Sequence, residues 1–116
     1  MRLIRIDHVS LNVGDRPQTV AWYEDVLGLS TTAPPSRPAD QPMFAGPDSA
    51  QLGLFADRAP GLRHIALATD RAGQLQVAVR LEQLGIPSEF VHHTSHDSVY
   101  FRDPDGVTLE VMVPTA

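Results

Sequence analysis

Stretches rich in branched apolar residues, in which apolar and polar side chains alternate, recur along the whole chain. Alternation with a period of two is typical of half-buried strands. The pattern predicts strands at residues 3–13, 29–32, 43–46, 50–56, 62–69, 87–92, 97–102 and 107–113. Two segments with helical spacing interrupt these strands. Each half of the chain is therefore expected to follow the order β-α-β-β-β.

Capping residues indicate where the two helices begin and end. The first helix is expected to start after Asp15 and to end at Gly28, which suits a left-handed cap. The second is expected over 71–84, with Asp70 as its N-cap and Gly85 at its end. The inner stripes are Val20, Tyr23 and Leu27 in the first helix and Val77, Leu81 and Leu84 in the second.

The two halves of the chain repeat each other. His8 and His64 occupy equivalent positions, whereas Glu110 is equivalent to Gly53. A pseudo-two-fold site would then offer two imidazoles and one carboxylate, with its fourth corner empty. The repeat therefore predicts a metal site with room for a substrate. The matching segments are 6–11 and 62–67, 27–29 and 84–86, and 46–53 and 103–110.

The faces of the expected strands support this prediction. Most strands have one strongly apolar face, suited to packing against helices, and one mixed face with small residues. His8, His64, Glu110 and Tyr100 all fall on the mixed faces, which together could line a cavity. The residues predicted to contact a substrate there are Ser10, Gly53, Phe55, Ser98 and Met112.

The chemistry of the three predicted ligands favours one divalent metal ion. Two histidines with one carboxylate form the facial triad of non-haem Fe(II) oxygenases, so Fe²⁺ is favoured, with Zn²⁺, Mn²⁺, Ni²⁺ and Mg²⁺ as alternatives. A lone histidine on a strand is more often a core residue than a ligand. Glu110 on an otherwise apolar strand is harder to explain in that way, because a buried unpaired carboxylate is costly.

The composition narrows the class of function. A net charge of −5 argues against non-specific binding to nucleic acid or to an anionic membrane surface. The sequence contains neither cysteine nor lysine, which excludes thiolate metal sites and Schiff-base chemistry. No apolar run approaches membrane-spanning length, and the first residues carry too much charge for a signal peptide. We expect a cytoplasmic protein with a small-molecule substrate.

The length of 116 residues suits a single domain over 1–116. We divide it into a first module over 1–56, a linker over 57–61 and a second module over 62–116. Neither module can bury its sheet alone, so the two are expected to pair within the chain or across a homodimer. The segment 33–42, which holds four of the ten prolines, is expected to be a surface loop or a partial lid.

Three motifs carry a resemblance to a known family: Asp7-His8-Val9, Leu62-Arg63-His64-Ile65-Ala66, and the segment Tyr100–Gly106 that leads to Glu110. With these motifs the whole chain resembles the vicinal oxygen chelate superfamily. That superfamily includes glyoxalase I, extradiol dioxygenases, fosfomycin-resistance transferases, methylmalonyl-CoA epimerases and bleomycin-resistance proteins. The resemblance implies an α+β fold of paired β-α-β-β-β modules that form a U-shaped cleft. It also implies metal ligands at His8, His64 and Glu110.

Within the superfamily, the extradiol dioxygenases match the C-terminal segment best. Their pattern of a His, an apolar-Tyr pair, an Asp-Pro-x-Gly turn and a Glu ligand is followed at residues 92–93, 99–100, 103–106 and 110. The resemblance implies that Tyr100, with His93 or His92, orients the substrate or moves a proton. The well-studied dioxygenases differ in being longer and in having an acid–base His upstream of the second metal ligand.

Other members of the superfamily match less well. Glyoxalase I and the epimerases usually carry a fourth ligand where this chain has Gly53, and the fosfomycin transferases use a lysine. Bleomycin-binding members lack the metal triad. We therefore expect a metal-dependent, extradiol-dioxygenase-like enzyme whose small substrate chelates through vicinal oxygens. The first alternative is isomerase, lyase or transferase chemistry, and the second is a non-catalytic protein that binds an antibiotic or a metabolite.

Three of these motifs also have purely structural explanations. Tyr100 is compatible with a core position as well as with a substrate contact. The segment 92–96 is expected to be an exposed loop without a metal of its own. Asp103-Pro104-Asp105-Gly106 is expected to be a type I turn that leads into the strand of Glu110.

Overall fold

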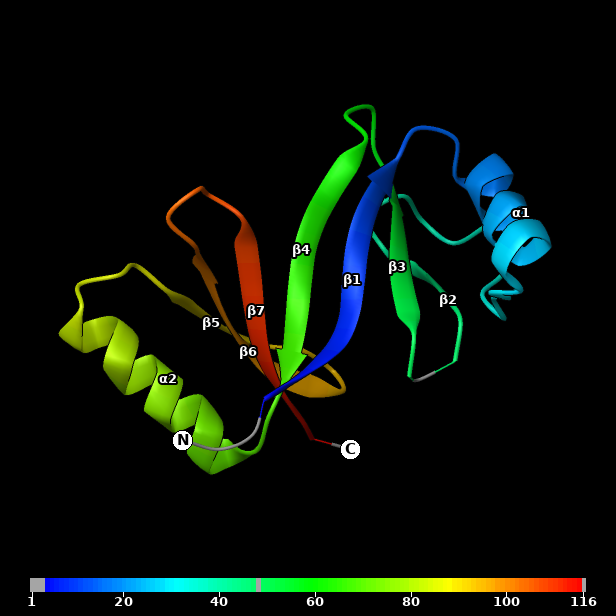
Figure 1. Cartoon of the computed structure of the whole chain (residues 1–116). Coiled ribbons are helices and arrows are strands. Elements are labelled where there is room, and N and C mark those ends of the chain that lie inside the picture. The colour runs from blue at the N-terminus through cyan, green and yellow to red at the C-terminus, as the bar shows by residue number, and fades with distance from the viewer. Residues whose placement is uncertain (1–3, 48, 116) are drawn as a thin grey trace. The chain divides into compact units, whose positions relative to one another are not determined.

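The computed structural model describes residues 4–47 and 49–115, which form two compact units (Figure 1). The N-terminal unit is Asp7–Arg63, and the C-terminal unit consists of the residues from His64 onward together with those up to Ile6. Both units combine one helix with strands. The predicted α+β class is therefore confirmed.

The N-terminal unit contains β1 (Arg5–Val13, most of which lies in this unit), α1 (Arg16–Leu27), β2 (Met43–Ala45) and β3 (Gln51–Ala56). β3 lies between the other two strands, parallel to β1 and antiparallel to β2. The strand predicted at 29–32 does not form. Leu29 N donates to Tyr23 O of the helix at 3.1 Å, and Ser30 O accepts from Gly46 N at 3.0 Å. A strand requires a ladder of bonds to a neighbouring strand, which these two do not form.

The C-terminal unit shows the complete β-α-β-β-β order. It contains β4 (Gly61–Ala68, most of which lies in this unit), α2 (Arg71–Gln83), β5 (Glu89–His92), β6 (His96–Arg102) and β7 (Thr108–Pro114). β4 runs parallel to β7, β6 is antiparallel to β7, and β5 is antiparallel to β6. The predicted turn before β7 forms, with a hydrogen bond of 3.0 Å from Gly106 N to Asp103 O.

The predicted capping residues begin and end both helices. The side chain of Asp15 accepts a hydrogen bond from Gln18 N, and Gly28 follows α1 with φ 70° in the left-handed region. Asp70 caps α2 in the same way, and Gly85 follows it with φ 68°. The short-range signals of the sequence therefore set the ends of each helix correctly.

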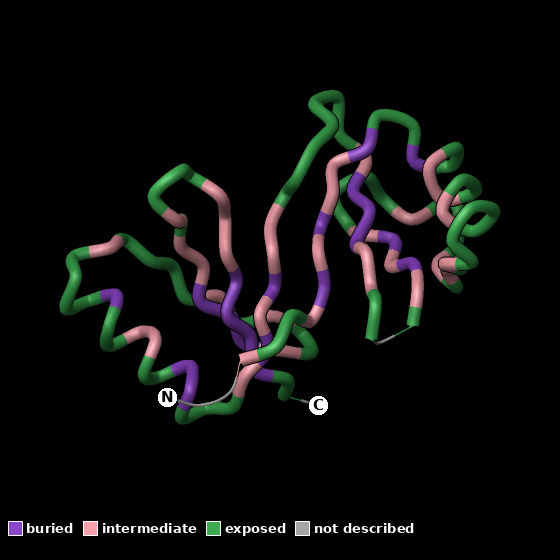
Figure 2. The backbone as a smooth tube through the Cα atoms, viewed as in Figure 1, coloured by how far each residue is buried: buried purple, intermediate pink, exposed green. Residues whose placement is uncertain are grey.

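The inner faces of the helices are only partly those that the spacing predicted. Val20 and Tyr23 of α1 pack against a buried cluster on the strands, and Leu81 of α2 is buried. Leu27 and Leu84 are 59% and 55% exposed, so their assignment to the inner stripes was wrong. Both lie at helix ends, where the chain turns away. Figure 2 shows the buried stretches concentrated on the strands.

A buried amide joins α2 to its sheet. The side chain of Gln74, which is 6% exposed, donates hydrogen bonds of 3.0 Å to the carbonyls of Asp97 and Val111 on β6 and β7. Arg71, also on α2, forms an ion pair of 2.7 Å with the Asp97 carboxylate. Hydrogen bonds from His92 and Arg71 hold the pKa of Asp97 below its usual value. These contacts fix how the helix sits on the strands.

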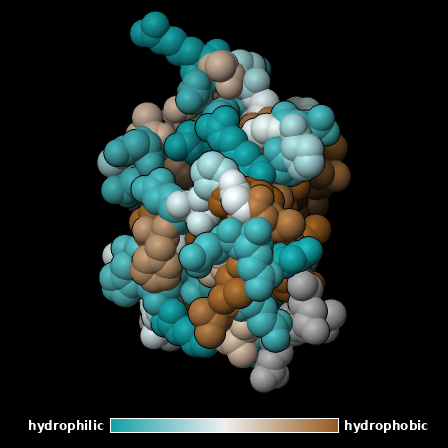
Figure 3. Space-filling view, turned by 90° about the vertical axis from the view of Figure 1, so that its left-hand side faces the viewer, coloured by the Kyte–Doolittle hydropathy of each residue, from teal (hydrophilic) through white to brown (hydrophobic). Residues whose placement is uncertain are grey.

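The outer surface of α2 is mixed. Leu75 and Val79 are 65% and 45% exposed, and Figure 3, which views this side of the molecule, shows hydrophobic groups among hydrophilic ones. Leu75 and Val79 lie four residues apart and line one open surface depression together with Gln76, Arg80 and Gln83. Within residues 4–47 and 49–115, no helix has the length and apolar character needed to cross a membrane.

A buried arginine anchors the proline-rich segment 33–42. Arg16, at the start of α1, is 5% exposed, and its guanidinium donates to main-chain carbonyls of the segment and of β3. Its acceptors are Gln41 O at 2.7 Å, Pro38 O at 3.1 Å, Leu54 O at 3.3 Å and Arg37 O. The segment is therefore held against its own unit as a structured connection.

Replacement of Arg16 by methionine tests this anchor. We expect Arg16→Met to lower the free energy of unfolding by about 2–4 kcal/mol, because buried carbonyls lose charged donors. Limited proteolysis should also cut the segment 33–42 faster. Arg58→Met, at an exposed position in the linker, serves as the control. Equal denaturation midpoints for the two variants, with no faster cleavage, would contradict this role of Arg16.

Candidate metal centre

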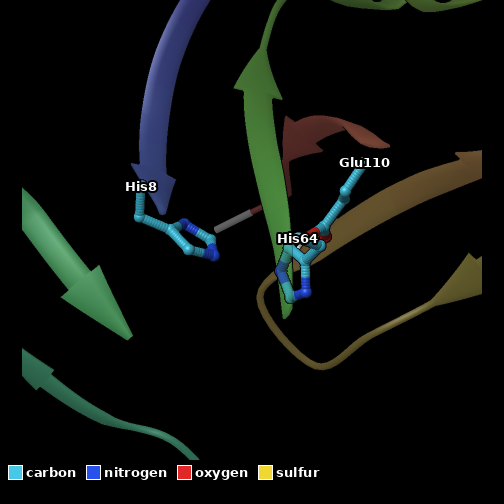
Figure 4. A group of neighbouring side chains, drawn as sticks. All are labelled: His8, His64 and Glu110. Atoms are coloured by element: carbon cyan, nitrogen blue, oxygen red, sulfur yellow. Dashed lines mark ion pairs between the residues drawn. The ribbon is translucent and has the colours of Figure 1, made fainter. Parts of the chain in front are cut away.

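The centre of the C-terminal unit is a buried carboxylate. Glu110 on β7 is 2% exposed, and its Oε1 lies 3.1 Å from Nε2 of His64 on the neighbouring strand β4 (Figure 4). Its Oε2 accepts a hydrogen bond of 2.6 Å from Ser98 Oγ and lies 3.3 Å from His96 Nε2. The partners of Glu110 in the described part of the chain are thus imidazole and hydroxyl groups. The structure brings together three residues predicted for the site: His64, Ser98 and Glu110.

This carboxylate stays ionised although it is buried. Burial alone would raise the pKa of Glu110, but hydrogen bonds from His64 and Ser98, the charge of His64 and a hydrogen bond from Tyr100 together lower it to about 2. Glu110 is therefore negatively charged at neutral pH. An ionised carboxylate beside an imidazole is the donor set that first-row divalent metals prefer.

Tyr100 lies beside this pair on β6. Its ring packs edge-on to the ring of His64 at 6.3 Å, and a hydrogen bond of 2.8 Å joins its hydroxyl to His93 Nε2. Burial and the charge of Glu110 raise the pKa of Tyr100 above its ordinary value. The phenol is therefore protonated at neutral pH and can act as a hydrogen-bond donor or proton source.

The three histidines at the turn between β5 and β6 lie on two different faces of the sheet. His92 is exposed and contacts Asp97, on the α2 side of the sheet, so it does not join the cluster around Glu110. His93 and His96 are half-buried and stack on each other at 4.5 Å. Their ligand atoms and those of Glu110 all lie within 4.8 Å of one another. The expectation of a wholly exposed loop was therefore wrong for His93 and His96.

The role of His96 could have been noticed in the sequence. His93 and His96 flank a tight turn, closed by a hydrogen bond of 2.8 Å from His93 N to His96 O, which places both imidazoles on one face. A His-x-x-His pattern between two short strands was the available signal. It was overlooked because His96 was assigned to the loop and not to the start of β6.

His8 is the chemically distinctive residue of the N-terminal unit. It lies on β1, is 8% exposed, and its Nδ1 is 2.7 Å from Asp7 Oδ2. A carboxylate at one ring nitrogen fixes the tautomer and orientation of a metal-binding histidine, which then coordinates through the other nitrogen. The ring of Phe44 on β2 packs edge-on to His8 at 5.1 Å. Neither Asp7 nor Phe44 was assigned a role from the sequence.

The strand registers of the two units are equivalent. Ser10 pairs with Gly53 in the N-terminal unit, and Ala66 pairs with Glu110 in the C-terminal unit. His8 lies two residues before Ser10, and His64 lies two residues before Ala66. Phe44 pairs with Gly53 as Tyr100 pairs with Glu110. The equivalence of Gly53 and Glu110 inferred from the repeat therefore holds in the structure, and Phe44 is the counterpart of Tyr100.

The other predicted contact residues are buried within their own units. Ser10 is 1% exposed and Phe55 is 8% exposed, with the guanidinium of Arg63 lying 3.9 Å above the Phe55 ring. Met112 packs with two alanines of β4 in the C-terminal unit. Beside Tyr100, a cavity of about 640 Å³ opens in that unit, with walls formed by residues 86–89, 100–102 and 108.

The comparisons with known proteins identify the family. The sequence profile of the Glyoxalase/Bleomycin resistance protein/Dioxygenase superfamily matches residues 5–111. The chain belongs to this superfamily. The resemblance that the histidine and glutamate motifs suggested is thus confirmed.

Two relatives and one solved structure indicate the range of the family. Biphenyl-2,3-diol 1,2-dioxygenase 3 of Rhodococcus globerulus is 30% identical over 94% of this chain, and this chain spans only 63% of that protein. Virulence protein STM3117 of Salmonella typhimurium is 27% identical, over 96% of this chain and 85% of the relative. Methylmalonyl-CoA epimerase of Mycobacterium tuberculosis superposes with a TM-score of 0.71 at 20% identity, covering 96% of this chain and 88% of the epimerase. The last likeness establishes the fold.

Replacement of Ser98 tests the electrostatics of Glu110. Since the pKa of Glu110 is lowered in the folded protein, its contribution to stability is present above the unfolded value of about 4.3 and is lost as the pH falls towards 2. Ser98→Ala should raise this pKa and destabilise the metal-free protein by about 1.5–3 kcal/mol at neutral pH, with a smaller effect near pH 3.

Chemical denaturation at the two pH values in the presence of EDTA measures this effect, and NMR of the labelled carboxyl group follows the pKa. The exposed Ser88→Ala variant is the control. A loss of stability that is equal at both pH values, with an unchanged titration, would show that Ser98 acts only through packing.

Proposed function

We propose that this chain is a metal-dependent enzyme in which His8, His64 and Glu110 hold one divalent ion. We further propose that it catalyses an extradiol-dioxygenase-like reaction on a small aromatic substrate that chelates through vicinal oxygens. Fe²⁺ is the ion that suits this reaction, because two histidines with one carboxylate leave positions for both substrate and dioxygen. Chemistry with Zn²⁺, Mn²⁺, Ni²⁺ or Mg²⁺ belongs to the alternative isomerase, lyase and transferase reactions.

The pair formed by His64 and Glu110 carries the proposal. A carboxylate that is 2% exposed, ionised, and in contact with an imidazole at 3.1 Å is costly to maintain for structure alone. An arginine would neutralise it at lower cost, and Glu110 is instead surrounded by groups that become metal ligands or orient them.

His8 is proposed as the third ligand because of the repeat and of its own contacts. It is the counterpart of His64 in the strand registers, and Asp7 holds its Nδ1 at 2.7 Å. This contact is the one that a ligating histidine commonly makes at its non-coordinating nitrogen. The two features are independent of each other, since one comes from strand pairing and the other from a side-chain contact.

A second set of ligands, His93, His96 and Glu110, competes with this assignment. We favour His8 and His64 for two reasons. Both come from strands, whereas His93 lies in the turn between β5 and β6, and strands position ligands more precisely than turns do. His93 is in addition bonded to the Tyr100 hydroxyl, which suits a role in proton transfer better than one in coordination.

The residues around the ion have distinct proposed roles. A bound divalent ion supplies a Lewis acid for the substrate oxyanion and, as iron(II), the redox chemistry that dioxygen requires. Ser98 holds Glu110 in one orientation, and Tyr100 with His93 donates or accepts a proton at the substrate oxygen.

The comparisons support the choice of reaction only in part. The dioxygenase relative is named for biphenyl-2,3-diol, an aromatic vicinal diol, and this chain spans 63% of that protein. Gly53 offers no fourth ligand, which favours a dioxygenase-like site over the four-ligand isomerases. A non-catalytic binding protein is the second alternative. A homodimer and a cytoplasmic location stay predictions.

Metal analysis of ligand variants tests the proposal. Anaerobic loading with Fe²⁺ should give about one ion per chain, and His8→Ala, His64→Ala and Glu110→Ala should each lose most of it. His92→Ala is the matched control, because His92 lies away from Glu110 on the α2 side of the sheet. His93→Ala and His96→Ala should keep the ion. Retention of the ion by His8→Ala and His64→Ala, with loss in His93→Ala, His96→Ala and Glu110→Ala, would assign the metal to the second set of ligands.

Oxygen uptake with a panel of catechols then tests the reaction. The loaded wild-type protein should consume oxygen with at least one catechol, and Tyr100→Phe should slow turnover more than it weakens metal binding. A loaded protein that consumes no oxygen with any catechol would leave the metal site intact and exclude the dioxygenase reaction.

A further inference from the structure

Equivalent positions in the two units carry very different residues. In the C-terminal unit, the side chain opposite Ala66 is Glu110, and it reaches the ring of His64 at 3.1 Å. In the N-terminal unit, the position opposite Ser10 is Gly53. Because the registers are the same, an acidic side chain at position 53 would extend towards His8 as Glu110 extends towards His64.

The space beside Gly53 is not left to solvent. A Cβ atom added at Gly53 would lie 3.0 Å from Cε1 of Phe44 and 3.0 Å from Ser10 Oγ, closer than side-chain contacts normally are. Phe44 pairs directly with Gly53 across β2 and β3, and its ring packs edge-on to His8 at 5.1 Å. The Phe44 ring and the Ser10 hydroxyl therefore crowd the place where a fourth ligand would begin.

We propose that Phe44 is the specificity-determining residue that keeps the fourth coordination corner of the metal free of protein ligands. The ring reserves that corner for substrate oxygens, and its apolar surface beside His8 favours a flat, uncharged aromatic ring over a charged acyl group. Its counterpart in the strand register of the C-terminal unit, Tyr100, carries a hydroxyl that Phe44 lacks. This inference rests on the proposed role of His8 as a ligand.

A double-mutant cycle tests the first part of the inference. The affinity for Zn²⁺ is measured by competition with a chromophoric chelator in the wild type, Gly53→Glu, Phe44→Ala and the double variant. Gly53→Glu alone should change the affinity by less than about threefold, whereas in the Phe44→Ala background it should tighten binding by more than about tenfold. Ala50→Glu, in both backgrounds, is the control for added charge at an exposed site.

Two results, one from this cycle and one from His8→Ala measured in the same assay, distinguish failure of the inference from failure of the proposed function. If Gly53→Glu tightens Zn²⁺ binding equally with and without Phe44, or in neither background, the role of Phe44 is overturned while the three-ligand site stands. If His8→Ala leaves Zn²⁺ affinity unchanged, the proposed function fails and this inference fails with it. Thermal unfolding of every variant shows whether the fold is retained.

Ligand binding provides a second test that does not depend on the double variant. The probes are 4-nitrocatechol, an aromatic chelator followed by its absorbance, and acetohydroxamate, an aliphatic one, each added to the Zn²⁺-loaded protein. Phe44→Leu, which preserves an apolar side chain of similar size, should weaken 4-nitrocatechol binding by about threefold to tenfold and change acetohydroxamate binding by less than about twofold. Equal weakening of both probes would overturn the apolar contact.

Discussion

The buried charge of Glu110 is the constraint on which the site depends. A carboxylate that is 2% exposed must be compensated, and here the compensation comes from His64, from the Ser98 hydroxyl and from His96. None of these groups carries a fixed positive charge. The cluster therefore retains its attraction for a cation, whereas an arginine in the same place would have made a structural salt bridge.

The same contacts fix the orientation of the Glu110 carboxylate. Ser98 and His96 engage Oε2, while Oε1 faces His64, so the two oxygens have separate partners. Parallel pairing of β4 with β7 and antiparallel pairing of β6 with β7 bring these side chains to one face of the sheet. The topology positions the groups, and their hydrogen bonds then fix the orientation of the carboxylate.

Much of the fold was predictable because its signals are local. Caps such as Asp15 and Gly28 act within a few residues, and the internal repeat fixed the positions of His8, His64 and Glu110 on their strands. The strand expected at 29–32 failed because its pairing depends on distant residues. Leu27 and Leu84 were misjudged because helical spacing does not show where the partner sheet ends.

The residues that sequence reasoning missed act through tertiary contacts. Arg16 resembles any surface arginine in the sequence, yet it is buried and donates to a distant segment. Phe44 matters only because β2 pairs with β3 and places its ring over Gly53. Strand parity assigned faces correctly, but it could not show which side chain fills the space that a glycine leaves.

The fold alone does not choose the reaction, since a methylmalonyl-CoA epimerase superposes with a TM-score of 0.71 at only 20% identity. The differences that matter are confined to side chains on equivalent registers. The repeated backbone provides equivalent positions in the two units, and their chemistry differs only through the side chains at those positions. Here one half carries a carboxylate and a phenol, at Glu110 and Tyr100, and the other a glycine and a phenyl ring, at Gly53 and Phe44. The two units therefore differ in the side chains at equivalent registers, although their strand pairing is the same.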